Sequence, residues 1–237
     1  MGVMAKGSGG GRRRAPVRPG DGRRQTRDAA PAASATPAAA GAAPFRLGAI
    51  PGATPGTWID RWHERRPNPL ELVPLTVAGQ RDALLAGDVD AALVRLPIDR
   101  DGLHVIPLYE EVPVVVMPKD SHLTAADELE ASDLAGEVLV LPRDDVLAMP
   151  LPDGAVAAEF DPPDTTAEAI AVVAAGVGVV VVPMSLARLH HRRDLDHRPL
   201  RDGPASAVAL AWVAERTTPD VEAFVGLVRG RTPRSSR

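Results

Sequence analysis

The sequence contains no cysteine, which excludes disulfide bonds, thiolate metal sites and cysteine nucleophiles. Aromatic residues are only 3% of the chain, so the core has to be built mainly from Val, Leu, Ile and Ala, which suits sheets covered by helices. The longest apolar run, 169–184, is interrupted by two glycines and a proline and is too short to span a membrane. The chain does not start with the apolar segment of a signal peptide. We therefore expect a cytoplasmic protein without membrane contact.

The motifs of the common enzyme classes are also missing. The sequence has no nucleophile-elbow serine, no HExxH zinc motif and no Walker loop. Gly176-Val177-Gly178 follows a predicted helix and precedes a predicted strand, which is the reverse of the order in a dinucleotide-binding fingerprint. We therefore expect no catalytic residues, no enzyme activity and no cofactor.

Clusters of titratable residues are present, but none has the pattern of a reactive centre. His190, His191 and His197 lie close to arginines, and this favours a solvated basic helix end over a metal site. The acidic pairs Glu110-Glu111 and Asp144-Asp145 are adjacent in sequence, and adjacent carboxylates rarely face each other across a substrate. We expect no metal site.

Residues 1–44 differ in composition from the rest of the chain. They hold eight basic residues against two aspartates, and this balance of +6 leaves −10 for the remainder of a chain whose net charge is −4. With few large apolar residues, the segment is predicted to be a disordered basic tail. We favour a solubilising tail, or a start codon placed too far upstream, over an arm that contacts nucleic acid nonspecifically. The acidic remainder is unlike a duplex-binding domain.

Strands and helices are predicted to alternate after residue 44. The spacing of Trp58, Ile59 and Trp62 predicts a helix that ends at Arg66, with Thr54 as its N-cap and Pro55 at its first position. A second helix is expected over 80–86, and strands over 45–50, 70–75 and 89–96. This βαβαβ order indicates a parallel sheet with helices on both faces, an α/β fold.

The second half of the sequence continues with short apolar strands. Thr165 and Glu168 have the spacing of a capping box, which predicts the start of a helix that ends at Ala175. Further strands are predicted at 103–108, 112–118, 138–141, 178–182, 196–200 and 205–213, and further helices at 127–134, 145–149, 185–191 and 219–229.

Candidate ligand-binding residues follow from this order, because ligands of open α/β folds bind beyond the carboxyl ends of the strands. Arg95 could hold a carboxylate with two hydrogen bonds, although an ion pair with Asp99 or Asp101 is an alternative. The helix that begins at Thr165 presents free N–H groups and suits an anion, although each threonine could simply be a helix cap. The full candidate set is Pro51, Gly52, Thr54, Thr57, Arg95, Leu96, Thr165, Thr166 and Pro183.

Several segments of the sequence form a recognisable series. They are Phe45 to Ile50, Gly87 to Leu93, "LHVIPLYE" from Leu103, "VVAAGVGVVVVP" from Val172, and Pro199-Leu200 followed by Ala209 to Trp212. Together they resemble one known family, the effector-binding (substrate-binding) domain of LysR-type transcriptional regulators. The resemblance covers about residues 45–231 and keeps the family's order.

The resemblance implies a type 2 periplasmic-binding-protein fold with two Rossmann-like lobes. Lobe one would contain about 45–111 and 205–231, lobe two about 112–204, and residues 232–237 would be a flexible basic tail. Two crossing strands would join the lobes, near 111–117 and 204–213. A small organic effector, which Arg95 suggests is an anion, would bind in the cleft between the lobes, and the domain would form a homodimer.

The sequence departs from full regulators of this family in one respect. Residues 1–44 have no apolar period that could form a helix-turn-helix, which argues against direct, sequence-specific DNA binding. We therefore expect a stand-alone effector-binding sensor linked to transcription, acting through a partner regulator. The alternatives are a solute-binding protein of a transport system, which would need export, and an enzyme on the same fold.

Overall fold

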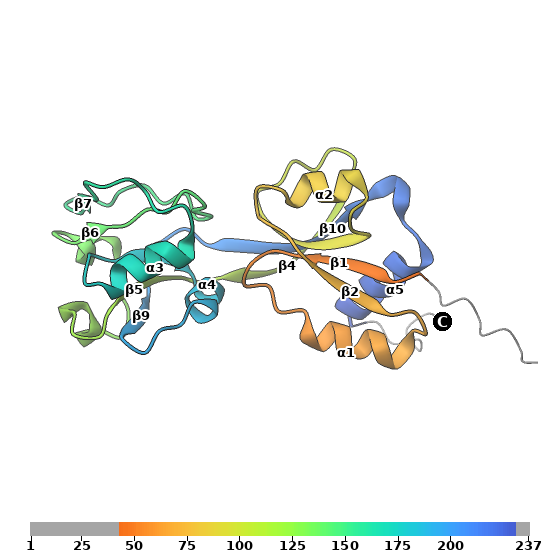
Figure 1. The fold of residues 1–237 in the computed structure, drawn as a ribbon, viewed down its shortest axis with the longest axis horizontal. Helices are drawn as coiled ribbons and strands as arrows, with labels where there is room; N and C mark the ends of the chain where they lie inside the picture. Colours follow the sequence, from red (N-terminus) through yellow and green to blue (C-terminus); the bar gives the residue numbers. More distant parts are fainter. Residues whose placement is uncertain (1–42, 231–237) are drawn as a thin grey trace, which may run out of the picture. The chain divides into compact units, whose positions relative to one another are not determined.

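A five-stranded sheet begins directly after the first described residues. The computed structural model describes residues 43–230, so most of the predicted tail 1–44, and the whole tail 232–237, lie outside the described residues. The predicted βαβαβ unit is present and its three strands are parallel. Its elements are β1 (Phe45–Ala49), α1 (Gly56–Arg65), β2 (Leu70–Pro74), α2 (Gln80–Ala86) and β3 (Ala91–Arg95) (Figure 1).

The sheet is completed by two strands that are distant in sequence. Strand β10 (Ser206–Val213) pairs antiparallel with both β3 and β4 (Leu103–Glu111), which gives the order β2-β1-β3-β10-β4. Helix α5 (Pro219–Val228) follows β10 after the 3-10 turn η3 (Ala214–Arg216). We call this sheet and its helices lobe one.

A second group of strands, lobe two, repeats this order. Strand β5 (Pro113–Pro118) pairs antiparallel with β8 (Val180–Pro183) and β9 (Leu195–Pro199), and β6 (Val138–Leu139) pairs parallel with β7 (Val156–Ala157). A parallel bridge between Leu139 and Val179 joins the two sets, so the order is β7-β6-β8-β5-β9. Helices α3 (Thr166–Ala174) and α4 (Met184–Leu189) pack against β5 and β8.

The chain passes between the lobes twice. Strand β4 of lobe one leads through Val112 into β5, and β9 of lobe two leads into β10 (Figure 1). In the spatial order of the strands, the fourth strand of each sheet (β10 or β5) comes directly after the fifth strand of the other sheet (β9 or β4) along the chain.

Each lobe has its own apolar core. In lobe one, the rings of Phe45 and Trp62 stack with centroids 4.6 Å apart, and Phe224 of α5 lies 5.3 Å from Phe45. The indole N–H of the buried Trp62 donates to the carbonyl of Asn68 at 2.9 Å, so the aromatic cluster leaves no indole donor unpaired. Lobe two has no aromatic residue in its core and is filled by valine, leucine and isoleucine, as the composition predicts.

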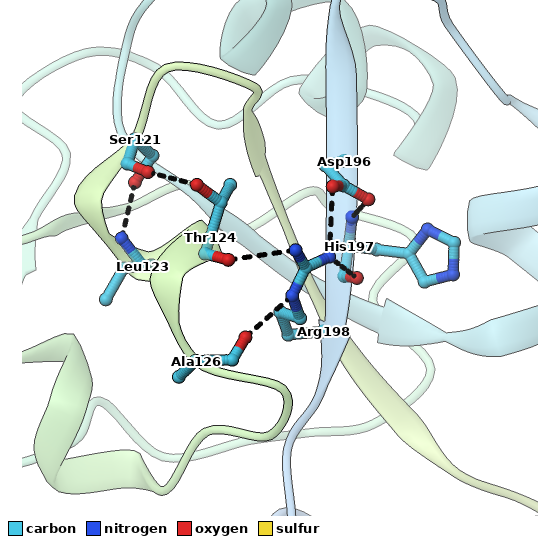
Figure 2. A network of polar contacts seen from close by, with 7 residues as sticks. All are labelled: Ser121, Leu123, Thr124, Ala126, Asp196, His197 and Arg198. Carbon is cyan, nitrogen blue, oxygen red and sulfur yellow. Dashed lines mark hydrogen bonds and ion pairs between the residues drawn. The ribbon is translucent and has the colours of Figure 1, made fainter.

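An arginine holds one loop of lobe two in place. Figure 2 shows Arg198 of β9 donating to the carbonyls of Ala126 at 2.7 Å and Thr124 at 2.9 Å, close to the 3-10 turn η1 (His122–Ala125). Its Nη1 atom also lies 3.0 Å from Asp196. Burial acts to raise the pKa of Asp196, but hydrogen bonds from the His197 N–H and from Arg198 outweigh it, and the pKa lies below its usual value.

Two local predictions were wrong and a third was too long. The helix predicted for residues 127–134 is only the 3-10 turn η2 (Ala131–Leu134), at whose N-terminal end the Glu130 N–H donates to the Asp133 carboxylate at 2.8 Å. Residues 145–149 are not helical, since the Asp145 carboxylate accepts a hydrogen bond from the Leu147 N–H at 2.9 Å and favours a turn. Thr54 does not cap α1, whose N-cap is Pro55 with no side-chain cap.

No helix within residues 43–230 combines the length and apolarity needed to cross a lipid bilayer.

Gly178 permits the closest approach between β6 and β8, and this predicts a stability difference between two neighbouring glycines. A Cβ atom at Gly178 would lie 2.0 Å from the Val138 carbonyl oxygen, and its φ is +61°. Gly176 also has a positive φ, +85°, but a Cβ there meets nothing within 4 Å. We expect Gly178→Ala to lower the free energy of unfolding by about 3 kcal/mol, and Gly176→Ala by about 1 kcal/mol. Urea unfolding of both variants measures this, and equal losses would contradict the assigned contact.

Candidate functional site

A cavity of about 810 Å³ lies where the parallel strands of both lobes end. Its wall is formed by the segments that follow β1, β2 and β3 in lobe one, and β6, β7 and β8 in lobe two. The carboxyl ends of parallel strands are where open α/β folds bind ligands. The lining residues are Pro51, Thr76, Val77, Ala78, Arg95, Arg143, Asp144, Asp145, Val146, Asp164, Thr165, Thr166, Ala167, Leu186, Leu189 and His190.

Arg95 contributes a buried charge to this wall. Its side chain is 2% exposed, and its Nη1 donates to the Glu111 carboxylate at 2.7 Å and to the Ser206 hydroxyl. The Nε and Nη2 atoms have no hydrogen-bond partner among the described residues. Guanidinium groups stay protonated in proteins, so Arg95, a residue that borders the cavity, keeps an ionised, buried donor edge without a hydrogen-bond partner among the described residues.

Gln80 holds the backbone of Arg95 in place. The Arg95 N–H donates to the Gln80 side-chain oxygen at 2.8 Å, and the Gln80 amide donates back to the Arg95 carbonyl at 2.9 Å. This reciprocal pair satisfies the end of β3, which has no further strand partner for these groups. The position of the guanidinium is therefore set by both its backbone and its side-chain contacts.

The opposite wall is built around the start of α3. The Thr165 hydroxyl accepts from the Glu168 N–H at 3.2 Å and completes the predicted capping box. The Thr166 hydroxyl, which is buried, donates to Asp144 at 2.9 Å. Arg143 and Asp164 form an ion pair at 3.0 Å on the same wall.

The predicted site residues fall into three groups. Pro51, Arg95, Thr165 and Thr166 border the 810 Å³ cavity. Gly52 and Thr54 border a neighbouring cavity of about 660 Å³, which Tyr109 and Glu111 also line. Thr57, Leu96 and Pro183 border neither cavity, because Thr57 is exposed on α1, Leu96 packs against the apolar core and Pro183 is buried in the pairing of β8 with β5.

The expected ion-pair alternative for Arg95 was wrong. Neither Asp99 nor Asp101 reaches it: Asp99 pairs with Arg81 at 3.0 Å, and the Asp101 carbonyl accepts from the same Arg81. The true partner, Glu111, was missed, as were Gln80, Ser206 and Asp144. One signal was available, because an arginine that ends the buried run Ala91–Arg95 requires a partner for its charge.

The pKa of Tyr109, a residue of β4, depends on its burial and on the charges of Glu111 and Arg95. Burial raises its pKa above the usual value, the Glu111 carboxylate raises it further and Arg95 opposes the rise. The phenol therefore stays neutral at physiological pH. Within residues 43–230, no group of three or more His, Asp or Glu side chains is arranged to hold a metal ion.

The family of the chain follows from comparison with known proteins. The family model described as "LysR substrate binding domain" matches residues 39–233. The chain belongs to this family. The resemblance expected from the sequence is thus confirmed.

Two curated relatives are regulators of transcription. The chain is 34% identical over 168 residues to the HTH-type transcriptional regulator CatR of Pseudomonas putida, covering 67% of this chain and 57% of CatR. It is 27% identical over 178 residues to the Hca operon transcriptional activator HcaR of Escherichia coli, covering 70% of this chain and 60% of HcaR. The chain therefore spans little more than half the length of these relatives.

Solved structures confirm the two-lobed α/β fold. The reduced OxyR regulatory domain of Pseudomonas aeruginosa is 27% identical, with a TM-score of 0.61, covering 80% of this chain and 96% of that domain. The BenM effector binding domain with its effector benzoate has a TM-score of 0.65 at 20% identity, covering 81% of this chain and 96% of that domain. The type 2 periplasmic-binding-protein fold predicted for the LysR family is therefore correct.

The pairing of Arg95 with Glu111 predicts unequal effects for two adjacent glutamates. Glu111→Gln leaves the buried guanidinium without a counter-charge, so we expect the free energy of unfolding to fall by about 3 kcal/mol. Glu110→Gln changes an exposed side chain and is expected to cost under about 0.5 kcal/mol. Denaturant unfolding of the two variants at neutral pH is the measurement, and a similar effect of both would rule out the buried pair as a stabilising contact.

Proposed function

We propose that this chain is a cytoplasmic sensor that binds a small organic effector in the 810 Å³ cavity and acts in transcriptional control. The observation that carries the proposal is Arg95, a buried arginine that borders that cavity and has two nitrogen atoms without a partner among the described residues. A buried donor without a partner is costly, and a ligand that accepts from it recovers that cost.

The ligand group that suits Arg95 is a carboxylate. The Nε and Nη2 atoms form one edge of the guanidinium plane, and two parallel N–H donors match the two oxygens of a carboxylate. The start of α3 on the facing wall adds the partial positive charge of a helix N-terminus. One protein of the same fold, the BenM domain, was solved with benzoate, which also carries a carboxylate.

Arg95 also provides a route from the ligand to the lobes. Its Nη1 binds Glu111, the last residue of β4, and Ser206, the first residue of β10. The chain crosses between the lobes twice. Glu111 lies at the start of the first crossing, and Ser206 lies at the end of the second. A ligand that binds Arg95 better in one arrangement of these connections than in another shifts the population toward that arrangement.

The way in which binding reaches DNA is part of the proposal. We propose that the chain forms a homodimer and meets DNA through a partner regulator, since residues 45–237 carry a net charge of −10 and would be repelled by phosphate. The curated relatives are named as regulators of transcription, which supports a role at this level.

The proposal predicts opposite effects of two substitutions on ligand binding. The full chain and its variants Arg95→Met and Glu111→Gln are each heated with a panel of small carboxylates that includes benzoate, phenylalanine and leucine, and the ligand-induced rise in Tm is compared among the three proteins. A bound carboxylate should raise the Tm in a dose-dependent way. We expect Arg95→Met to lose most of this rise, because the donor edge is gone. We expect Glu111→Gln to show a larger rise, because the guanidinium has lost its competing anion.

The two variants control for each other, since both break the same ion pair and both lower the starting stability. A ligand-induced rise of equal size in both would place the carboxylate away from Arg95. The absence of any rise across the panel would argue against the sensor role itself.

A further inference from the structure

The carboxylates of the cavity are not all neutralised by the protein. Three aspartates line it, Asp144, Asp145 and Asp164, against two arginines, Arg95 and Arg143, and one histidine, His190, which forms no ion pair with them. Arg143 pairs with Asp164, and Arg95 pairs with Glu111, which does not line this cavity. Among the described residues, no ion pair reaches Asp144 or Asp145, so two negative charges face the cavity without a cation.

These two aspartates also keep free acceptor capacity. Asp144 accepts one hydrogen bond, from the Thr166 hydroxyl at 2.9 Å, through Oδ1. Asp145 accepts one, from the Leu147 N–H at 2.9 Å, again through Oδ1. Within residues 43–230, no hydrogen bond reaches the Oδ2 atom of either residue. An ionised carboxylate offers about four acceptor positions, so each can bind a further donor.

This charge pattern disfavours a ligand that carries only negative charge. Such a ligand gains from Arg95 but lies in the same cavity as two uncompensated carboxylates. Asp145 is half-buried and Asp144 is exposed, so water screens their repulsion of an anion only in part. A ligand with a cationic group next to its carboxylate satisfies both sets of groups. Repulsion of the simple anion and attraction of the zwitterion act together to give selectivity.

We infer that the ligand is a zwitterion of the amino-acid type, whose carboxylate binds the free edge of Arg95 and whose ammonium group binds Asp144 and Asp145. This inference rests on the proposed function, because it assigns the ligand class of the same cavity. The apolar side chains of Val77, Val146, Leu186 and Leu189 and the small side chains of Ala78 and Ala167 complete the wall and suit an apolar substituent.

The test uses ligands that share an apolar side chain and differ in whether they carry the carboxylate, the ammonium group or both. One set is phenylalanine, 3-phenylpropanoate and 2-phenylethylamine, and a second is leucine, 4-methylpentanoate and 3-methylbutylamine. Affinity of the full chain for each is measured by calorimetry near neutral pH. We expect the amino acid of at least one set to bind about 10-fold or more tightly than both its deaminated acid and its decarboxylated amine. The acid lacks the ammonium contact and the amine lacks the carboxylate contact, so each loses one charge-assisted hydrogen bond.

Substitution of the two aspartates locates the ammonium group. Asp144→Asn with Asp145→Asn keeps the acceptors for Thr166 and Leu147 but removes both charges. We expect this variant to bind the amino acid no more tightly than the acid, and to bind the acid at least as well as the unmodified chain does. Asp161→Asn, an exposed aspartate outside the cavity lining, should keep the original preference.

Three outcomes overturn the inference, and they are distinguishable. If the deaminated acids bind as tightly as the amino acids, or more tightly, the cavity binds anions: the sensor proposal stands and the zwitterion assignment fails. If no member of either set binds, while carboxylates raise the Tm through Arg95, the assignment also fails. If nothing binds in either experiment, the proposed function fails with it.

Discussion

The need to satisfy one buried positive charge organises the centre of this molecule. Arg95 ends a strand whose five residues are all buried, so its charge cannot be solvated by water and has to be met by protein groups. Glu111, Ser206 and Gln80 meet part of this need, and they come from β4, β10 and α2. The end of β4 and the start of β10 are thereby fixed beside the end of β3. An apolar residue in place of Arg95 would leave Glu111 buried without a partner, so the pair is a constraint on position rather than a simple source of stability.

The same residue connects the two cavities near the strand ends. Arg95 borders the larger cavity and Glu111 borders the smaller one, so a buried ion pair lies between them. Because the charges are poorly screened by water, a charged molecule in either cavity changes the field at the other. The polar chemistry of this fold is concentrated here, whereas the cores of the two lobes are apolar.

Local signals in the sequence were sufficient for much of the fold. The βαβαβ unit, the Gly87 end of α2 and the capping box of Thr165 and Glu168 depend on residues a few positions apart, and all three are present. The site was less predictable. Arg95, Thr165 and Thr166 could be placed at strand or helix ends, but the partners of Arg95 lie 16 and 111 residues away in sequence and no periodicity indicates them. The turns after β6 depend on carboxylates that bind backbone N–H groups, and this competes with the helix that the sequence pattern favours.

Strand β10, the fourth strand of the lobe-one sheet, comes after all of lobe two in the chain, and this affects the order in which the lobes can fold during synthesis. Lobe two uses residues 113–199, which are contiguous, so all its strands have been synthesised before β10 leaves the ribosome. Lobe one lacks the strand that joins β3 to β4 until residues 206–213 appear, after the whole of lobe two has been made. At about 5–20 residues per second, the interval between the synthesis of β4 and that of β10 lasts several seconds. During it, the edges of β3 and β4 are unpaired and Arg95 has no Ser206 to bind. Lobe one, whose first strands are made before those of lobe two, is therefore the later of the two lobes to close.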